Sequence, residues 1–277
     1  MGMFQCMWNL LPKRAPVVPV VRLEGVIAAR TGPFGGLNLN SLAPALERAF
    51  TMRRAPAVFL AINSPGGSPV QSALIAGRIR ALAEQHGKPV LAFCEDAAAS
   101  GGYWIACAAD EIYADPASVL GSIGVISAGF GFQEAIGRLG IERRLRTAGH
   151  EKSLSDPFRP ATPDDEARLA EVLEALHVEF KAWVRGRRGP RLTAPEDALF
   201  TGRFWTGRQA LPLGLCDGLA DARGEARRRF GDKVRLLPVT GRRRSFPWSL
   251  LGGAGESLAR GALAVAEERA AWARIGL

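Results

Sequence analysis

Short apolar segments alternate with amphipathic ones along the first half of the chain, and this alternation constrains the fold more than any other feature. The apolar, β-branched segments cover residues 17–28, 57–64 and 89–95, and their composition favours strands. Segments with helical spacing separate them at residues 39–50 and 70–85. Strands that alternate with helices predict an α/β fold, with a mostly parallel sheet and flanking helices.

The same alternation continues further along the chain. We expect short strands at residues 111–115, 123–127 and 142–148, and a helix at residues 133–140. Residues 163–185 predict a long helix, because acidic residues fill its first turn and basic residues lie toward its end. Ligand sites in such folds collect where strands end, so the loops after the strands are the places to search.

Length and composition predict one main domain with a segment at each end. A chain of 277 residues can bury one large core. We expect this domain at residues 17–222, preceded by a segment at residues 1–16 that contacts a membrane surface or a neighbouring subunit. Residues 223–277 form a basic tail, and its alanine-rich stretch at residues 257–276 predicts a helical appendage. This helix contacts a subunit or a membrane, or it packs back on its own domain.

The sequence also gives an expectation for the location of the protein. No run of about 18 or more apolar residues occurs, so no transmembrane span is predicted. The first residues lack the basic-then-apolar order of a secretory signal. We therefore expect a cytoplasmic protein, or one held peripherally on the inner membrane.

Basic residues outnumber acidic ones, 36 to 27, for a formal net charge of +9. Arginine clusters lie at residues 185–191, 227–229 and 242–244. No zinc-finger spacing, helix-turn-helix pattern or RRM-type aromatic signature accompanies them, so no nucleic-acid partner is expected. The clusters fit a solvated surface or a peripheral contact with anionic membrane lipid.

The four cysteines give no sign of a cofactor site. They are widely spaced and form no CxxC or Cys/His pattern. Cys94 and Cys107 lie in apolar runs and are expected in the core. We predict neither a metal nor an organic cofactor.

Ser100 stands out in the stretch "EDAAASGGYW", where three alanines precede it and two glycines follow it. It lies between a predicted strand and a predicted helix. Serine is favoured as a helix N-cap, where its oxygen accepts a hydrogen bond from a free N–H. The same position also suits a nucleophile, because the positive end of the helix dipole and the small neighbours favour an approaching substrate. The stretch alone leaves both interpretations open.

The loop "NSPGGSP" is a second candidate for the site. Gly66 and Gly67 follow a predicted strand, and glycine lets backbone N–H groups face a substrate with no side chain between. Gly101, beside Ser100, offers another such N–H. Donors of this kind stabilise the oxyanion that forms when a nucleophile attacks a carbonyl. The other interpretation of this loop is an ordinary strand-to-helix turn.

The base that would activate Ser100 is harder to identify. The chain has three histidines: His86 at a predicted helix end, His177 inside the long helix, and His150 in a loop. Lys152 follows His150 by two residues, and desolvation can lower the pKa of a lysine far enough to make it a base. Only five of the 36 basic residues are lysines, which makes Lys152 mildly informative.

Four segments in order resemble the signal peptide peptidase A (protease IV) family: "INSPGGS", "EDAAASGGYWIACAADEIYADPASVLGSIGVI", "AGHEKSLSDPFRP" and "TGRFWTGRQALPLGLCDGLAD". The resemblance covers about residues 17–222. It implies a Clp-protease/crotonase-like fold and a serine endopeptidase that uses a Ser/Lys dyad. It further implies peptide or unfolded-protein substrates, such as signal-peptide remnants, and assembly into homo-oligomers in which neighbours can complete the site.

The resemblance also implies roles for individual residues. Ser100 would be the nucleophile and Lys152 the general base. Gly66, Gly67 and Gly101 would form the oxyanion hole, and Ser122 of "LGSIG" would orient the lysine ammonium. The related Clp subunit carries a histidine in the strand that corresponds to "SIGVIS", and this sequence has none there.

Two other functions compete with a peptidase. A crotonase-like acyl-CoA enzyme would use the same backbone donors for an enolate and would leave Ser100 and Lys152 idle. A non-catalytic scaffold is the other, and the presence of Ser100, Ser122 and Lys152 argues against it. Trp104, Phe130 and Phe132 would line a groove or belong to the core, and we expect the core.

Overall fold

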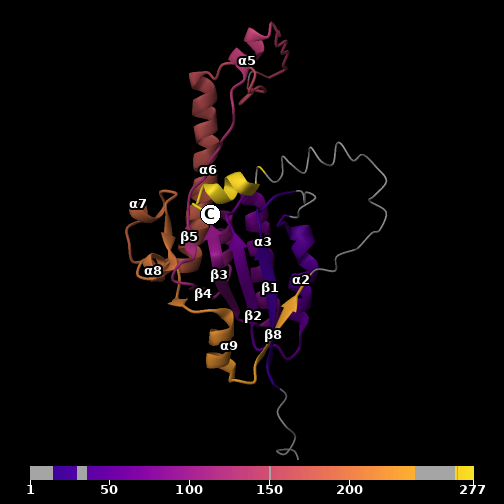
Figure 1. The fold of residues 1–277 in the computed structure, drawn as a ribbon, viewed down its shortest axis with the longest axis vertical. Helices are drawn as coiled ribbons and strands as arrows, with labels where there is room; N and C mark the ends of the chain where they lie inside the picture. The colour runs from indigo at the N-terminus through magenta and orange to yellow at the C-terminus, as the bar shows by residue number, and fades with distance from the viewer. Residues whose placement is uncertain (1–14, 30–35, 150, 241–265, 267) are drawn as a thin grey trace, which may run out of the picture.

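The computed structural model describes residues 15–29, 36–149, 151–240, 266 and 268–277. Its centre is an eight-stranded sheet in which six strands lie in the order β6-β5-β3-β2-β1-β8 (Figure 1). β4 pairs with β3, and β7 pairs with β4. The strands are β1 (Val17–Glu24), β2 (Val58–Ser64), β3 (Val90–Ala99), β4 (Glu111–Ala114), β5 (Val119–Gly121), β6 (Phe204–Thr206), β7 (Gly218–Leu219) and β8 (Arg235–Val239).

All of these pairings are parallel except that of β5 with β6. The predicted mostly parallel sheet with flanking helices is therefore confirmed. β2 is buried along almost its whole length, as is typical of a parallel strand with both faces covered. The strand ends that lead into the candidate loops consequently meet at one edge of the sheet.

The helices cover both faces of the sheet. One large apolar cluster joins the sheet to the helices α2 (Leu39–Thr51), α3 (Pro69–His86), α4 (Gly101–Ala106) and α6 (Pro163–Arg188). A second cluster, around Phe59 and Phe93, lies under α9 (Ala222–Phe230). Short helical segments complete the chain: α5 (Gln133–Arg138), η2 (Gly189–Arg191), α7 (Glu196–Leu199) and α8 (Gly207–Ala210).

The start of α6 and the segment before it project from the body as an arm, defined here as residues 125–170 (Figure 1). Its chain is mostly exposed, and α5 buries no residue. The prediction that Phe130 and Phe132 belong to the core is wrong, because they are 81% and 44% exposed. Trp104, in contrast, is buried in the core and stacks on Phe180.

Two predicted strands, at residues 123–127 and 142–148, are not formed. Both lie wholly or mainly in the arm, where neither pairs with another described strand. A strand needs a neighbouring edge that takes up its N–H and C=O groups. The composition favoured strands, but it could not show whether a partner strand would be present.

The sheet extends beyond residues 17–222, the part of the chain that carries the family resemblance. β8, which the sequence places in the tail, pairs with β1 from Val17↔Arg235 to Val21↔Val239. Part of the predicted tail helix is also formed, at residues 268–273. No helix among the described residues is long and apolar enough to cross a membrane.

Candidate functional site

Ser100 lies at the sharp junction between β3 and α4. Its backbone has φ 51° and ψ −119°, a conformation that costs a non-glycine residue energy and clusters at functional sites. Its position is that of the helix N-cap, but its side chain makes no capping hydrogen bond. The N-cap interpretation therefore loses its physical basis, and the hydroxyl stays available for other chemistry.

The glycine loop lies directly against Ser100. A Cβ on Gly66 would stand 2.8 Å from both the Ser100 Cβ and the Gly101 nitrogen. A Cβ on Gly67 would overlap the Ile27 carbonyl oxygen at 2.0 Å. Both glycines have positive φ, 103° and 142°, so a side chain would be excluded by conformation as well as by space. The structure thus brings Ser100, Gly101, Gly66 and Gly67 together.

The hydrogen bonds of these glycines separate them into two kinds. The Gly66 N–H donates to the Ser64 hydroxyl at 3.2 Å, so it is already used. The N–H groups of Gly67 and Gly101 donate to no partner in the described part of the chain. Gly101 is the first residue of α4, where backbone donors have no partner within the helix. Two free donors therefore lie in the residues that adjoin Ser100, one in the glycine loop and one at the start of α4.

Ser64 and Asn63 hold this loop in place, and sequence reasoning missed both. Ser64 is fully buried, and its hydroxyl donates to the Gly25 carbonyl at 2.7 Å. The Asn63 side chain accepts from the Ala97 N–H at 3.1 Å and donates to Asp96 at 2.8 Å. These bonds accompany a register shift between β2 and β3. Their signal in the sequence is a polar pair closing an otherwise apolar strand.

Ser122 lies next to Ser100 across the β3–β5 pair. The Ser100 N–H donates to the Gly121 carbonyl at 2.8 Å, and Ala99 pairs with Gly121. Ser122 also has positive φ, 51°, and its N–H donates to the Arg203 carbonyl at 2.8 Å. The chain therefore turns sharply at both serines, side by side at the sheet edge.

Lys152 lies in the arm and not beside Ser100 in this single chain. It is exposed, and its neighbour Glu151 pairs with Arg168 at 3.0 Å. Arg168 precedes His177 by nine residues on α6, a rise of about 13 Å. The His177 ring, in turn, contacts the Ile123 carbonyl at 3.2 Å, next to Ser122. Lys152 is thus displaced from the site along the arm.

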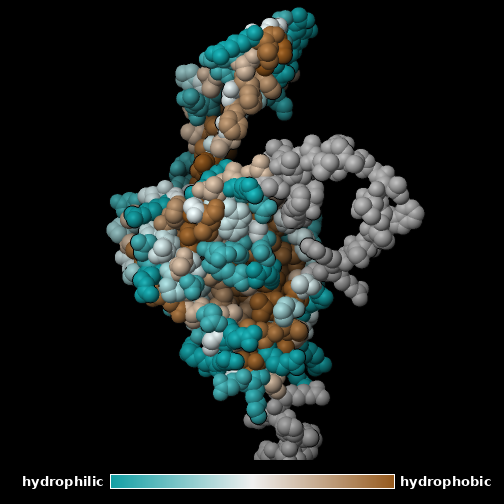
Figure 2. Space-filling model, in the orientation of Figure 1, coloured by the Kyte–Doolittle hydropathy of each residue, from teal (hydrophilic) through white to brown (hydrophobic). Residues whose placement is uncertain are grey.

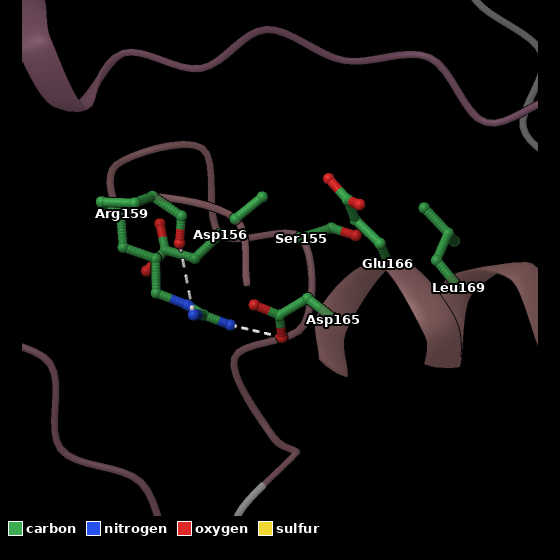
Figure 3. A pocket seen from close by; sticks show the side chains of 8 residues that line it. Ser155, Asp156, Arg159, Asp165, Glu166 and Leu169 are labelled. Carbon is green, nitrogen blue, oxygen red and sulfur yellow. Dashed lines mark hydrogen bonds and ion pairs between the residues drawn. The ribbon is translucent and has the colours of Figure 1, made fainter. Parts of the chain in front are cut away.

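A small hollow in the arm shows how the segment around Lys152 is held (Figure 3). The Arg159 guanidinium donates to the Asp165 carboxylate at 2.6 Å and to the Ser153 carbonyl at 3.1 Å. The hydrogen bond from Arg159 lowers the pKa of Asp165. The volume of the hollow is about 80 Å³, too small for a peptide, so we assign it to the arm's own structure.

Neither of the two histidines that the structure describes, His86 and His177, is placed to act as the base for Ser100. His86 ends α3, a helix that begins beside the glycine loop and is about 27 Å long. His86 therefore lies far from Ser100. The Nδ1 atom of His177 lies 3.8 Å from Glu174, so both ring nitrogens face other groups. His150 lies outside the described residues.

The described cysteines are not competing nucleophiles. Cys94, Cys107 and Cys216 are buried, as predicted for the first two. Burial raises the pKa of the Cys107 thiol to about 12 and that of Cys216 to about 11. A thiol reacts as its thiolate, so these groups are inert at neutral pH. Cys6 lies outside the described residues.

Comparisons with known proteins relate the chain to one peptidase family. The family model for peptidase family S49 matches residues 82–230, a range that includes Ser100, Ser122 and Lys152. The chain is 30% identical to the chloroplastic serine protease SPPA of Arabidopsis thaliana, over 87% of this chain and 37% of that protein. It is 48% identical, over 97% of this chain, to 39% of a Brucella abortus protein named Na(+)/H(+) antiporter NhaA. The chain thus spans less than two fifths of each of these relatives.

Among solved structures, a mutant of the 1510-N membrane-bound stomatin-specific protease is similar to this chain. The two share 17% sequence identity with a TM-score of 0.45, over 80% of this chain and 98% of that one.

Proposed function

The chain belongs to peptidase family S49, and from that premise we propose that it is a serine endopeptidase whose nucleophile is Ser100. The observation that carries this proposal is the pairing of a strained serine with two free backbone donors. The Ser100 hydroxyl caps no helix, and the N–H groups of the nearby residues Gly67 and Gly101 are free in the described structure. Attack on a peptide carbonyl would place its oxygen between these donors.

The proposed oxyanion hole has fewer donor residues than the resemblance implies. Gly66 contributes space, because its missing side chain lets the loop touch Ser100. Its N–H is held by Ser64 and does not face a substrate. We therefore assign the donor role to Gly67 and Gly101. Removing one such donor in other peptidases costs about 2.7–4 kcal/mol in kcat.

Lys152 is the base in this proposal. Neutral Lys152 would take the Ser100 proton while Oγ attacks the peptide carbonyl, and it would then protonate the departing amine. A water molecule, deprotonated by the same lysine, would hydrolyse the acyl-enzyme and regenerate Ser100. Ser122 would hold the lysine ammonium from its place beside Ser100.

Because Lys152 lies in the arm, we propose that a neighbouring copy supplies it. The arm carries exposed large apolar side chains: Ile126, Phe130, Phe132, Leu139, Ile141 and Leu145. Figure 2 shows patches of brown surface on the arm. Apolar surface of this extent marks an interaction site. A homo-oligomer that buries the arm against another body would cover these side chains. It would also bring Lys152 to a second copy's Ser100 and give residues 123–127 a strand to pair with.

We place this activity at a membrane surface. One relative of nearly this whole chain is named an antiporter, a class of membrane protein. The substrates we propose are unfolded or membrane-associated peptides such as signal-peptide remnants. Anionic lipid would attract a chain with a net charge of +9.

The test is hydrolysis of unfolded casein from about pH 6 to about pH 10, because a lysine base works only when deprotonated. We expect the wild-type rate to rise toward alkaline pH. Ser100→Ala and Lys152→Ala should each lose more than about 99% of it. Lys152→Arg should be equally inactive, since arginine does not deprotonate.

Lys181→Ala is the matched control, because Lys181 pairs with Glu174 on α6 and has no place in the site. The oligomeric state of each variant is measured in parallel. Activity that survives in Lys152→Ala would move the base elsewhere. A wild type with no activity on casein would favour the scaffold.

A further inference from the structure

The lysine loop, defined here as residues 151–159, carries Lys152 on the arm. The Lys152 side chain is exposed, and it makes no hydrogen bond or ion pair within the part of the chain that the structure describes. The residues on both sides of it, in contrast, are held. On the near side, the Glu151 carboxylate pairs with Arg168 on α6 at 3.0 Å.

On the far side of Lys152, Arg159 joins the lysine loop to the first turn of α6 (Figure 3). Its guanidinium donates from Nε and Nη2 to the Ser153 carbonyl, at 3.3 and 3.1 Å. The same Nη2 atom donates to Asp165 Oδ1 at 2.6 Å. Asp165 is the third residue of α6, and its other carboxylate oxygen accepts from the N–H and the hydroxyl of Thr162. One planar fork therefore fixes the residue after Lys152 to the capping box of a helix.

The pair of Arg159 and Asp165 is partly shielded from solvent, because the two side chains are only 26% and 17% exposed. Fully exposed salt bridges contribute little, since water screens them and two mobile side chains must become ordered. Here Thr162 already orders the carboxylate, and the Ser153 carbonyl already orders the guanidinium. The pair can thus hold a defined geometry.

A second group of contacts fixes the end of the lysine loop to the rest of the arm. The Asp156 carboxylate accepts from the Phe158 N–H at 3.0 Å and pairs with Arg143 at 3.2 Å. The Pro157 carbonyl accepts from the Phe132 N–H at 2.6 Å, and the rings of Phe132 and Phe158 lie 5.8 Å apart. These contacts hold the end of the loop, so removing the Arg159 side chain alone should not unfold it.

Helix α6 connects this arrangement to the body. Its 26 residues span about 39 Å, and its last turn is fixed where the buried Arg188 donates to Asp217 at 2.7 Å. Near its middle, the His177 ring contacts the Ile123 carbonyl at 3.2 Å. A helix held at these two places is a stiff element, and the lysine loop is tied to its first turn.

We propose that Arg159 is a positioning residue for Lys152, acting through the Ser153 carbonyl and the Asp165 carboxylate. It keeps the residue after Lys152 in one place relative to α6, so that the lysine amine reaches a second copy's Ser100 in a reactive geometry. The inference rests on the proposed function and adds one residue to its machinery. A reacting group that lies about 1 Å out of place can cost about 100-fold in rate.

Steady-state kinetics on unfolded casein test this role. Arg159→Met keeps an apolar stem of similar length but has no donor. We expect kcat to fall about 10- to 100-fold, while KM stays within about twofold, because Ser100 and the oxyanion donors of the body are unchanged. Arg159→Lys should be intermediate, since an ammonium lacks the planar fork. In both variants the rate should still rise toward alkaline pH, because Lys152 remains the base.

Arg185→Met is the matched control, because Arg185 lies at the other end of α6 and forms the same kind of pair with Glu196. It should keep the wild-type kcat. The oligomeric state and the thermal melt of every variant are measured in parallel. Wild-type kcat in Arg159→Met would overturn the proposal.

Mixed oligomers separate positioning from damage to the fold. Arg159→Met is reassembled with Ser100→Ala in one mixture and with Lys152→Ala in another. In the first, the Ser100→Ala copy supplies Lys152 together with an intact Arg159, so hydrolysis should exceed that of Arg159→Met alone. In the second, every remaining Lys152 lies on a copy without Arg159, so hydrolysis should not exceed it. Where Ser100→Ala and Lys152→Ala complement each other, equal activity of these two mixtures would overturn the proposal, since a fault in folding or assembly affects both.

The same assays distinguish failure of the positioning role from failure of the proposed function. If hydrolysis requires Ser100 and Lys152 but not Arg159, the positioning role is wrong and the peptidase stands. If wild type shows no Ser100-dependent hydrolysis, the peptidase fails, and the positioning role fails with it. If Ser100→Ala and Lys152→Ala do not complement each other while wild type is active, both residues act within one copy, and the kcat of Arg159→Met alone decides.

Discussion

At the scale of single residues, the site is built from backbone conformations that disfavour most side chains. Ser100 and Ser122 both have a φ of 51°, and such strain costs about 1–3 kcal/mol per residue. At Ser100 the side chain makes no capping hydrogen bond to α4, and free N–H groups lie in the adjoining residues. The sequence indicated Ser100 and the glycines by their position after apolar strands. It could not show that the Gly66 N–H is already held by Ser64, because that bond depends on the loop's path.

Gly101 offers the sharpest test at this scale. A Cβ there would lie 2.4 Å from Ser72 Oγ, 3.2 Å from Ile27 Cδ1 and 3.3 Å from the Gly67 nitrogen. Gly101→Ala should therefore displace both proposed oxyanion donors and lower kcat about 100- to 1,000-fold. Adding Ser72→Ala removes the closest of these contacts and should restore part of the loss. The measurement is casein hydrolysis, with a thermal melt of each variant to confirm folding.

Gly77→Ala is the control for this prediction. A Cβ on Gly77 meets nothing within 4 Å, and alanine favours the α3 helix by roughly 0.5–1 kcal/mol. It should leave kcat unchanged. Wild-type kcat in Gly101→Ala would show that no oxyanion donor lies at this position.

At the scale of elements, buried charge pairs attach the outer helices to the sheet. Arg188, at the end of α6, is 2% exposed and donates to Asp217 at 2.7 Å and to the Gly214 carbonyl at 2.6 Å. This fixes the C-terminal end of α6 to the β4–β7 region. Removing one partner of such a pair is strongly destabilising, because the other charge stays buried without a partner. In the sequence, both residues are indistinguishable from surface charges.

Helix α9 is held in the same way, and its attachment should depend on pH. Hydrogen bonds from Arg228 and Arg229 lower the pKa of the buried Glu225 to about 2, against an ordinary value of 4.5. A depressed carboxyl pKa stabilises the fold above the unfolded value, and this contribution is lost as pH falls. The loss should run from about pH 4.5 to about pH 2 and amount to roughly 3 kcal/mol.

Urea unfolding at several pH values measures this effect. Glu225→Gln should be less stable than wild type at neutral pH and should lack this part of the acid dependence. Asp232→Asn, an exposed position just after α9, should behave like wild type. An acid dependence that is the same in Glu225→Gln and wild type would assign it to other carboxyl groups.

At the scale of the whole molecule, the residues of the predicted site are divided between two parts. The body holds Ser100, and the arm holds Lys152. The alternating pattern predicted the sheet and its helices, because strands that are buried on both faces have almost continuously apolar sequences. The position of Lys152 could not be predicted, since it depends on how far α6 carries the arm from the body. The unpaired segments at residues 123–127 and 142–148 have the same cause. Their predicted strands require an edge that one copy of the described chain does not provide.

We propose that Ser100 of one copy and Lys152 of another form one active site. Mixing two inactive proteins, Ser100→Ala and Lys152→Ala, tests it directly. After partial denaturation and joint reassembly, mixed oligomers would contain sites with an intact Ser100 and an intact Lys152 from different copies. We predict that casein hydrolysis, absent from each protein alone, appears in the mixture and rises toward alkaline pH. A mixture that reassembles but stays inactive, while wild type treated in the same way recovers, would contradict this account.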